Sequence, residues 1–344
     1  MRTKDDLRQL QALPLELKIG LTKRRISDWV NYYGTSGVYV SFSGGKDSTV
    51  LLHMVRELFP EVEAVFVNTG LEYPEIQQFV KSFDNVTILR PEMRFDEVIK
   101  NYGYPLISKS VANCIRGAKN GSSYRLKRMR GEVMQPNGEK SWHNTEKYAP
   151  IMSCDFEVSE MCCDVMKKKP CKDFEKQTGK KPFLATMAQE SILREKNWIT
   201  FGCNAFDSAR PKSMPMSFWT EQDVLQYIKK YNIPIASVYG EVVYETEPEQ
   251  MRVEEYGIEN CGTEPLCTTG CDRTGCIFCA FGAHLEKESR FERLKQTHPR
   301  QYAYCIGGGE YDENGVWKPN KQGLGMGHVF DELNKIYGDD FIKY

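Results

Sequence analysis

Residues 38–53 read VYVSFSGGKDSTVLLH. An apolar, β-branched run ends at Phe42, two glycines and small hydroxyl residues follow, and an apolar helical pattern then begins. This order predicts a strand, a tight loop and a helix that starts near Ser48. Two glycines let the backbone turn sharply and present its N–H groups, and the helix adds the positive end of its dipole. The stretch therefore predicts a cradle for phosphate.

The side chains of this loop fit the same purpose. Lys46 can neutralise phosphate oxygens, and Ser43 and Ser48 can donate hydroxyl hydrogen bonds. Asp47 is the expected Mg²⁺ partner, with a helix-capping role as the alternative. The loop is not a Walker A motif, because Gly-x-x-x-x-Gly-Lys-Ser/Thr is absent from it.

The order Ser-Gly-Gly-Lys-Asp-Ser resembles the PP-loop of the adenine nucleotide α-hydrolase superfamily, which includes ATP pyrophosphatases and sulfonucleotide reductases. The resemblance implies that the ligand is ATP or a sulfonucleotide, either adenylyl sulfate (APS) or phosphoadenosine phosphosulfate (PAPS). It places the phosphates on the residues Ser41, Ser43, Gly44, Gly45, Lys46, Asp47 and Ser48. An ordinary Gly-Gly turn is the alternative, although a turn needs neither the lysine nor the serines.

Length and composition indicate one large α/β domain with an appended unit. The 344 residues can bury a full core, and a formal charge of -1 gives no global sign of nucleic-acid or membrane binding. The N-terminus MRTKDDLRQLQ lacks the apolar core of a signal peptide, and no apolar run approaches the roughly 18 residues that span a bilayer. We therefore expect a soluble, cytoplasmic protein. Twelve cysteines then favour metal ligation or redox chemistry over disulfides.

Strand and helix patterns alternate along the first two thirds of the chain. Strands are predicted at 38–42, 62–68, 86–90 and 182–187, and helices at 15–33, 49–59, 74–83, 95–102 and 221–231. The alternation predicts an α/β fold with a doubly wound, mostly parallel, five-stranded sheet. We expect an N-terminal helical segment at 1–36, a nucleotide-binding domain at 37–240 and a Cys-rich, metal-binding region at 241–344. Residues 241–259 are acidic and predict a surface excursion.

A polar stretch follows the second predicted strand. Ligands of an open parallel sheet bind at the carboxyl ends of its strands. Residues Asn68, Thr69, Gly70 and Glu72 are therefore expected to face the nucleotide. The alternative is a polar loop followed by a helix that begins at Pro74.

The segment 108–147 interrupts the alternation and is locally basic. Its cations are Arg116, Lys119, Arg125, Lys127, Arg128 and Arg130, with Tyr124 among them. One interpretation is a surface that binds RNA or DNA phosphates, and the other is a solvated, partly mobile insertion. We favour the second, because acidic residues elsewhere cancel the charge.

The run Glu-Ser-x-x-Arg at 190–194 resembles the segment with which sulfonucleotide reductases hold the anionic end of their substrate. The resemblance implies that Arg194 faces sulfate, phosphate or pyrophosphate, while Glu190 and Ser191 shape the loop. The alternative is an exposed ion pair between Glu190 and Arg194 at i,i+4. Arg210 and Lys212 are candidate second phosphate contacts, with solvent-facing charge as the alternative.

Cysteines concentrate at two places. Cys162 and Cys163 are adjacent, and Cys267, Cys271, Cys276 and Cys279 lie within thirteen residues, which is a strong signal for a metal site. The last four could hold Zn²⁺ by themselves. Cys162-Cys163 together with Cys276-x-x-Cys279, however, resembles the 4Fe-4S ligand set of assimilatory adenylyl-sulfate reductases. The resemblance implies a 4Fe-4S cluster on these four, with Cys267 and Cys271 as substitutes or a redox pair, and a Zn²⁺ site remains the rival.

The resemblance to the phosphoadenosine phosphosulfate (PAPS) reductase family runs from about Val38 to Gly282. One departure matters, because the C-terminal Glu-Cys-Gly-Leu-His motif with the nucleophilic cysteine of true reductases is absent, and Cys305 is the only cysteine beyond Cys279. The five histidines show no catalytic or metal-binding spacing.

Taken together, these features imply an ATP pyrophosphatase that uses Lys46, Asp47 and Arg194 to adenylate a substrate for sulfur transfer. One alternative is a sulfonucleotide reductase that releases sulfite, and another is a non-catalytic nucleotide-binding subunit of a modification or defence complex. The expected partners are an adenine nucleotide, a sulfur-donor or electron-donor protein, a nucleic-acid substrate and a second copy of the chain. No membrane partner is expected.

Overall fold

Two compact units make up the computed structural model, which describes residues 2–245 and 265–344. The first, here called the sheet unit, comprises Met1–Asn68, Glu72–Leu89 and Cys171–Thr274. The second, here called the cysteine unit, comprises Thr69–Leu71, Arg90–Pro170 and Gly275–Tyr344. Most of the predicted acidic excursion at 241–259 lies outside the described residues.

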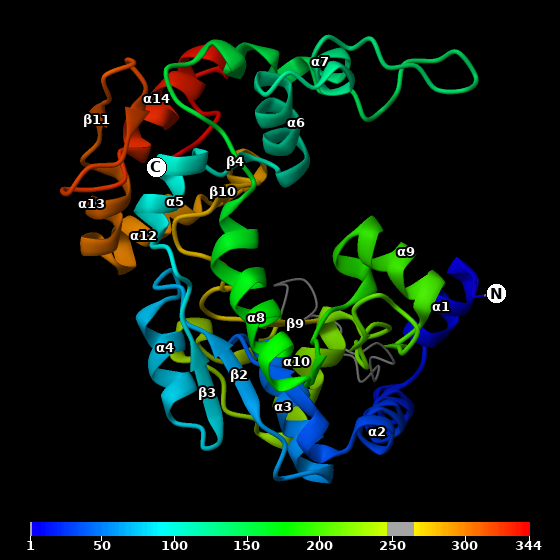
Figure 1. Cartoon of the computed structure of the whole chain (residues 1–344). Coiled ribbons are helices and arrows are strands. Elements are labelled where there is room, and N and C mark those ends of the chain that lie inside the picture. Colours follow the sequence, from blue (N-terminus) through cyan, green and yellow to red (C-terminus); the bar gives the residue numbers. More distant parts are fainter. Residues whose placement is uncertain (1, 246–264) are drawn as a thin grey trace, which may run out of the picture. The chain divides into compact units, whose positions relative to one another are not determined.

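The sheet unit is built on one six-stranded sheet in the order β3-β2-β1-β5-β7-β6. Its strands are β1 Val38–Ser41, β2 Ala64–Val67, β3 Val86–Leu89, β5 Lys181–Phe183, β6 Asn204–Ala205 and β7 Lys212–Ser213. Strands β2 and β3 of this sheet are labelled in Figure 1. Every neighbouring pair is parallel except β6 with β7. The predicted α/β fold with a mostly parallel sheet is confirmed. The sheet has six strands instead of five, because the two-residue β6 is too short to show a sequence period.

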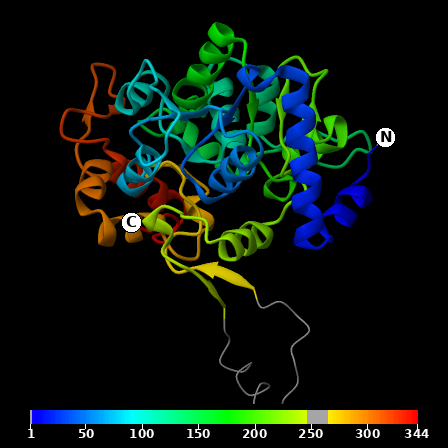
Figure 2. The ribbon, with the colours of Figure 1, turned by 90° about the horizontal axis from the view of Figure 1, so that it is seen from below.

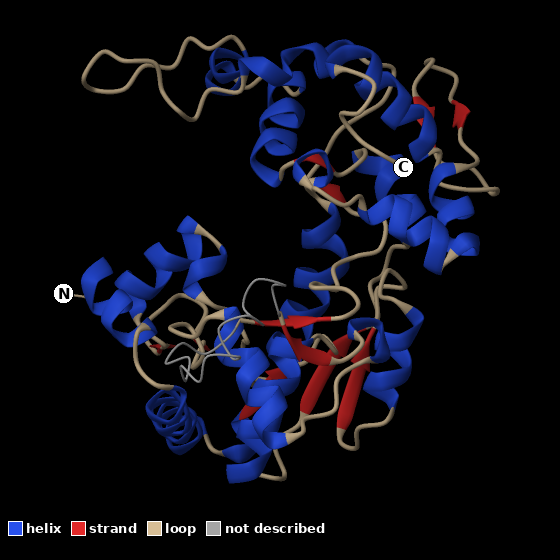
Figure 3. Cartoon of the chain, turned by 180° about the vertical axis from the view of Figure 1, so that it is seen from behind, coloured by secondary structure: helices blue, strands red, loops and turns tan. Residues whose placement is uncertain are grey.

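Helices cover both faces of this sheet (Figure 3). In β1, Tyr39 contacts Phe174 of α8, the helix Lys169–Thr178, with ring centroids 5.2 Å apart. In β5, Phe183 pairs in register with Val40 and contacts Trp29 of α2, the helix Leu15–Tyr33, at 6.4 Å. Because successive strand residues point to opposite faces, α8 and α2 pack on opposite sides of the sheet.

The helices of the sheet unit are α1 Lys4–Gln11, α2 Leu15–Tyr33, α3 Lys46–Leu58, α4 Pro74–Lys81, α9 Ile192–Phe201 and α10 Glu221–Tyr231, with the 3₁₀ turns η1 Thr35–Gly37, η4 Ala188–Glu190 and η5 Ser237–Tyr239. Helices α2, α3, α4 and α10 lie close to their predicted ranges, α1 falls within the predicted N-terminal helical segment, and α9 was not predicted. Helix α8, Lys169–Thr178, begins in the cysteine unit and continues into this one. A two-stranded hairpin of β8 Val242–Tyr244 and β9 Leu266–Thr268 completes the unit.

A buried ion pair ties the N-terminal helices to the rest of the sheet unit. Lys18 of α2, the long blue helix of Figure 2, places its Nζ 2.6 Å from the carboxylate of Asp223 in α10. Their side chains are only 3% and 9% exposed. The same carboxylate accepts a hydrogen bond from the backbone N–H of Thr220 at 2.6 Å, which completes the N-cap of α10.

The cysteine unit is mainly helical. Its elements are α5 Phe95–Tyr102, β4 Leu106–Ile107, α6 Lys109–Lys119, α7 Ser123–Met129, the 3₁₀ helix η2 Glu146–Ser153, the π-helix η3 Asp164–Lys168, β10 Ala280–Phe281, η6 Ala283–Leu285, α12 Arg290–Thr297, α13 Pro299–Ile306, β11 Glu310–Tyr311, β12 Trp317–Lys318 and α14 Met326–Tyr337. Strands β4 and β10 pair in parallel, and β11 and β12 form an antiparallel pair. Among the described residues, no helix combines the length and the apolar character needed to cross a membrane.

The expectation of a solvated, mobile insertion at 108–147 is wrong for its first half. Ser108 caps α6 by accepting a hydrogen bond from the N–H of Val111 at 3.2 Å. The helix then buries Cys114 and Ile115 completely. Apolar residues at helical spacing were present in this segment, but the many cations obscured them.

Candidate functional site

The loop between β1 and α3 has the backbone of a phosphate cradle. Gly44 has a φ of +72°, and a Cβ there would lie 2.8 Å from the Cγ2 atoms of both Ile76 and Val80. Gly45 is the N-cap of α3, so the helix begins at Lys46 instead of near Ser48 as predicted. The first turn of α3 therefore carries Lys46, Asp47 and Ser48, whose N–H groups have no partner within the helix and belong to the loop.

Serine hydroxyls hold the loop closed. The Oγ atoms of Ser43 and Ser48 are 3.0 Å apart, and the N–H of Gly45 donates to Ser43 Oγ at 3.3 Å. Ser48 Oγ also donates to the carbonyl of Gly45 at 2.9 Å. Both serines thus shape the cradle before any ligand is bound, and their hydroxyls keep the ability to turn toward phosphate oxygens.

Lys46 is a buried cation at the centre of the site. Its side chain is 4% exposed, and Nζ lies 3.0 Å from Glu221 and 3.8 Å from Asp47. It donates to the carbonyl oxygen of Asp272 at 2.8 Å, and it lies 5.7 Å from the ring centre of Tyr239. A buried ammonium held by oxygen acceptors is ready to exchange them for phosphate oxygens.

Asp47 carries the one loop carboxylate, and its Oδ1 is buried without a hydrogen-bond donor among the described residues. Burial raises the pKa of Asp47, as does the nearby Glu221, while Lys46, Arg273 and Arg194 lower it. An orphaned carboxylate oxygen among three cationic side chains fits a Mg²⁺ ligand. Asp47 therefore lies within the site, and helix capping, the alternative that the sequence left open, does not account for its position.

The segment after β5 supplies a second set of charges. Strand β5 neighbours β1, and the chain order reverses between them, which is where open α/β sheets bind ligands. Ser191 caps α9 by accepting a hydrogen bond from the N–H of Arg194 at 3.3 Å, and Arg194 forms an ion pair with Glu190. Burial lowers the pKa of Arg194, whose charge also interacts with Arg273 and Asp47. The predicted i,i+4 ion pair is confirmed, and the anion-facing role of Arg194 stays a prediction.

Arg210 and Lys212 occupy other surroundings. Arg210 forms two hydrogen bonds of 2.7 Å with the carboxylate of Glu175, which also accepts one from the hydroxyl of Tyr39 at 2.8 Å. The charge of Arg210 is therefore already paired with Glu175 of α8, to which Tyr39 of β1 also bonds. Lys212 lies in β7, where burial lowers its pKa.

The remaining predicted nucleotide residues lie at carboxyl ends of strands. Ser41 is the last residue of β1 and pairs in register with Val65 of β2. Asn68 follows β2 and donates its N–H to the carbonyl of Leu89 at 2.9 Å. Glu72 is buried in the sheet unit, whereas Thr69 and Gly70 belong to the cysteine unit.

Several residues of the site were missed by sequence reasoning. Tyr239 accepts a hydrogen bond from the backbone N–H of Lys46 at 3.2 Å, and its hydroxyl lies 2.5 Å from that of Thr274. Glu221 and the backbone of Asp272 hold the Lys46 ammonium. No sequence signal could have found Tyr239 or Glu221. The segment 272–274 was attributed to a metal site because cysteines surround it.

The four cysteines of the predicted cluster line one small apolar cavity of the cysteine unit. Cys162, Cys163, Cys276 and Cys279 share it with Phe95 and Met166. The π-helix Asp164–Lys168 directly follows the Cys162-Cys163 pair, and such widened turns are frequent at functional sites. Cys276 and Cys279 are joined by a turn in which the N–H of Cys279 donates to the carbonyl of Cys276 at 3.0 Å.

The electrostatics of this cavity favour the thiolate at Cys163 and the neutral thiol at Cys162 and Cys279. The thiol of Cys162 donates a hydrogen bond to Cys163, which raises the pKa of Cys162 and lowers that of Cys163 to about 5. Lys109 and Lys167 lower the pKa of Cys163 further. Burial raises the pKa of Cys279. Four sulfur donors, an apolar wall and two nearby ammonium groups fit the negatively charged sulfur ligands of an iron–sulfur cluster.

Cys267 and Cys271 belong to the sheet unit and are not among the residues that line this cavity. Cys305, in α13, is fully buried, burial raises the pKa of its thiol, and that thiol contacts the sulfur of Met326 at 3.5 Å. Within residues 2–245 and 265–344, no three Cys, His, Asp or Glu side chains are arranged to hold a single metal ion.

Part of the basic segment is neutralised within the cysteine unit. Arg116 forms an ion pair with Glu160 at 2.6 Å, and Lys119 pairs with Glu157 at 3.0 Å. Lys127 and Arg130 are exposed on and beside α7. The basic surface of this segment is therefore smaller than its six cationic residues alone would imply.

Residues 37–113 and 124–281 match the family model described as "Phosphoadenosine phosphosulfate reductase domain". The match covers the phosphate loop, the Glu-Ser-x-x-Arg segment and all four cavity cysteines.

Relatives among curated proteins are distant. An uncharacterized protein of Methanocaldococcus jannaschii is 32% identical over 95 residues, which are 25% of this chain and 23% of that protein, so the chain spans about a quarter of its length. A phosphoadenosine 5'-phosphosulfate reductase of Xanthomonas euvesicatoria is 23% identical over 227 residues, 65% of this chain and 75% of that protein. Among solved structures, the phosphoadenylyl-sulfate reductase of Candida auris aligns with a TM-score of 0.37 and 13% identity, over 69% of this chain and 91% of that one.

Proposed function

Because the chain belongs to the phosphoadenosine phosphosulfate reductase domain family, we propose that it is a PP-loop ATP pyrophosphatase that adenylates an acceptor for sulfur transfer. The observation that carries the proposal is the loop centre, where the buried Lys46 ammonium and the orphaned Asp47 carboxylate lie together. A lysine suits the phosphates of ATP, and an unsatisfied carboxylate suits the Mg²⁺ that accompanies them.

Binding begins with an exchange of partners at Lys46. The ammonium leaves Glu221 and the carbonyl of Asp272 for the phosphate oxygens, while the N–H groups at the start of α3 donate to the same oxygens. Arg194 and Arg273 bring two further positive charges, which support the developing charge of the leaving pyrophosphate. Mg²⁺ held by Asp47 would supply Lewis-acid polarisation of the phosphoryl oxygens.

In the proposed reaction, an acceptor oxygen attacks the α-phosphorus of ATP, the α–β bridging oxygen leaves as pyrophosphate, and the acceptor becomes adenylated. The four cavity cysteines Cys162, Cys163, Cys276 and Cys279 would hold a 4Fe-4S cluster, which supplies electron-transfer or sulfur-binding chemistry when bound. A Zn²⁺ site that needs neither Cys162 nor Cys163 is the rival to the cluster.

The first test separates cleavage at the α-phosphate from other ATP chemistry. ATP labelled at the α-phosphate is incubated with the protein and Mg²⁺, and labelled AMP and ADP are resolved. With no other acceptor present, water takes the adenylyl group, so we expect AMP and pyrophosphate. We expect Lys46→Met to lower the rate by about a hundredfold because the transition-state charge loses a buried cation. Lys196→Met, on the exposed face of α9, is the matched control and should leave the rate unchanged. Formation of ADP, or release of sulfite from PAPS without ATP cleavage, would overturn the proposal.

The second test addresses the cavity cysteines. Protein purified without oxygen is assayed for iron and sulfide, and its visible spectrum is recorded. About four irons and four sulfides per chain are expected, with loss of both in Cys163→Ala and in Cys276→Ala. Cys267→Ala should retain them because Cys267 does not line the cavity. One zinc that survives Cys163→Ala would contradict the cluster while leaving the adenylation proposal in place.

A further inference from the structure

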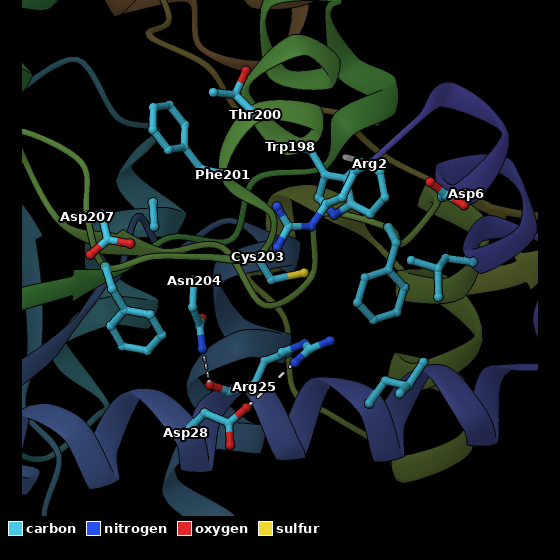
Figure 4. A pocket seen from close by; sticks show the side chains of 15 residues that line it. Arg2, Asp6, Arg25, Asp28, Trp198, Thr200, Phe201, Cys203, Asn204 and Asp207 are labelled. Atoms are coloured by element: carbon cyan, nitrogen blue, oxygen red, sulfur yellow. Dashed lines mark hydrogen bonds and ion pairs between the residues drawn. The ribbon is translucent and has the colours of Figure 1, made fainter.

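A second cavity of about 560 Å³ lies in the sheet unit, and none of the phosphate-loop residues lines it (Figure 4). Its volume falls within the roughly 300–1,000 Å³ of small-molecule sites. It is formed by α1, α2, the C-terminal half of α9 and the edge strand β6. Trp198 and Phe218 form a buried apolar wall of the cavity, and the partly exposed Phe201 adds a further aromatic surface.

Most of the polar groups around this cavity already have partners. The carboxylate of Asp6 caps α1 by accepting from the N–H of Thr3 at 2.7 Å. The amide of Asn204 donates to the carbonyl of Arg25 at 2.9 Å and accepts from the hydroxyl of Ser213 at 2.7 Å. These groups hold the walls together and are not available to a ligand without loss of their own bonds.

The hydrogen-bond donors of the cavity, by contrast, are underused. The indole N–H of Trp198 is buried and has no oxygen or nitrogen acceptor at hydrogen-bond distance among the described residues. Arg25 makes a long contact of 3.6 Å to Asp28, both side chains are 44% exposed, and its guanidinium also interacts with the thiol of Cys203. The indole N–H and the weakly paired guanidinium can therefore both donate hydrogen bonds to an acceptor that enters the cavity.

Arg2 is the third hydrogen-bond donor of the cavity, and its guanidinium occupies space that any side chain at position 202 would fill. Gly202 has a φ of +73°, and a Cβ there would lie 2.6 Å from Cζ of Arg2. The guanidinium of Arg2 therefore lies against the backbone of Gly202. Figure 4 shows the thiol of Cys203 between the guanidinium groups of Arg2 and Arg25. Burial raises the pKa of Cys203, while a hydrogen bond from Trp198, the charges of Arg25 and Arg2 and a hydrogen bond from Arg25 lower it.

We propose that this cavity binds a small organic anion, a carboxylate or a phosphate ester, whose charged head lies on Arg2 and Arg25 and whose apolar body packs on the aromatic wall. The three donors supply charge-assisted and neutral hydrogen bonds to two or three oxygens of the head. Phe201 and Phe218 supply apolar surface for a ring or a chain. The site is separate from the phosphate loop in its residues, so the inference does not depend on the proposed reaction.

Phenyl phosphate and benzoate are suitable probes, because each combines one anionic head with one ring. Their binding to the full chain is measured by isothermal titration calorimetry. Arg25→Met and Arg2→Met should each weaken the better probe by about tenfold, which is the effect of losing one charge-assisted hydrogen bond. Arg24→Met is the matched control, because it removes the same charge from the neighbouring position of α2, which does not line the cavity. Tighter binding of phenyl phosphate assigns a phosphate ester, and tighter binding of benzoate assigns a carboxylate.

A second readout reports directly on the cavity. Alkylation of Cys203 by iodoacetamide, followed by peptide mass spectrometry, should slow several-fold when the probe is bound, and Lys46→Met should not change this protection. Equal probe affinity in Arg25→Met and Arg24→Met would overturn the proposal. So would loss of binding in Lys46→Met without loss in Arg25→Met, because the probe would then occupy the phosphate loop.

Discussion

Replacement of Gly44 by alanine tests the phosphate cradle most directly, because its cost follows from two features of the structure. The positive φ of +72° costs an alanine about 1–2 kcal/mol. The new Cβ would also lie 2.8 Å from the methyl carbons of Ile76 and Val80, which are both buried, and overpacking of this kind costs about 1–3 kcal/mol. We therefore expect Gly44→Ala to lower the free energy of unfolding by about 2–5 kcal/mol.

Gly179→Ala separates these two contributions. Gly179 lies in the same unit with a φ of +74°, and a Cβ at this position would extend into open space, with no neighbouring atom within 4 Å. Its alanine variant should bear only the backbone cost, and the lower unfolded-state entropy of alanine affects both variants alike. The difference between the two should be about 1–3 kcal/mol, or about 2–12 °C in Tm by differential scanning calorimetry.

Calorimetric titration with Mg-ATP gives the functional half of the experiment. Gly44→Ala should bind ATP more than tenfold more weakly, because a shifted loop re-aims its N–H groups, whereas Gly179→Ala should bind normally. Equal Tm values for the two variants would refute the steric argument. Normal ATP affinity in Gly44→Ala would refute the assignment of the cradle.

Three further predictions concern single groups of known burial. Burial raises the pKa of Asp47, so ionisation of this carboxylate lowers the stability of the folded state as the pH rises from the ordinary pKa of aspartate to the raised one. Asp47→Asn should therefore have a Tm up to a few degrees above that of the wild type at pH 8 and equal to it at pH 4. The same variant should lose Mg-ATP binding. Lower stability of Asp47→Asn at pH 8 would contradict this sign. Asp223→Ala should cost about 3–5 kcal/mol in chemical unfolding, because it strands the buried Lys18 charge, and adding Lys18→Met should recover part of the loss; no recovery would mean that the pair is not the cause. Cys305→Ala should retain ATP cleavage and iron content, because that thiol is fully buried; loss of sulfur chemistry in a folded Cys305→Ala protein would favour the reductase alternative.

The strongest sequence predictions were those based on long periodic segments with clear ends. Helices α2, α5 and α10 have the predicted bounds, because each combines an apolar stripe with an N-terminal or C-terminal signal. The start of α3 was predicted near Ser48, two residues late, because Lys46 and Asp47 were assigned to the loop. In the structure Gly45 is the N-cap, and the helix begins directly after it.

Other errors arose where local composition conflicted with packing. Helix α6 was obscured by its cations, two of which are neutralised by acidic residues about 40 positions away. Arg210 was a reasonable phosphate contact from its type alone, yet Glu175 uses both sides of its guanidinium. Ion pairs between distant segments leave no periodic trace in sequence, so such partners could not be predicted.

The sequence by itself determined the α/β fold, the phosphate loop and the family, because each rests on residues that are neighbours along the chain. Backbone turns, helix caps and hydrophobic periods are short-range properties, and they are legible wherever the residues that need them are adjacent. The tertiary structure alone decided which distant groups meet. It brought Tyr239, Glu221 and Asp272 to the Lys46 loop, placed Cys162-Cys163 beside Cys276 and Cys279, and formed the arginine-lined cavity around Cys203. These contacts join segments tens to hundreds of residues apart, and only the packing of the folded chain selects them.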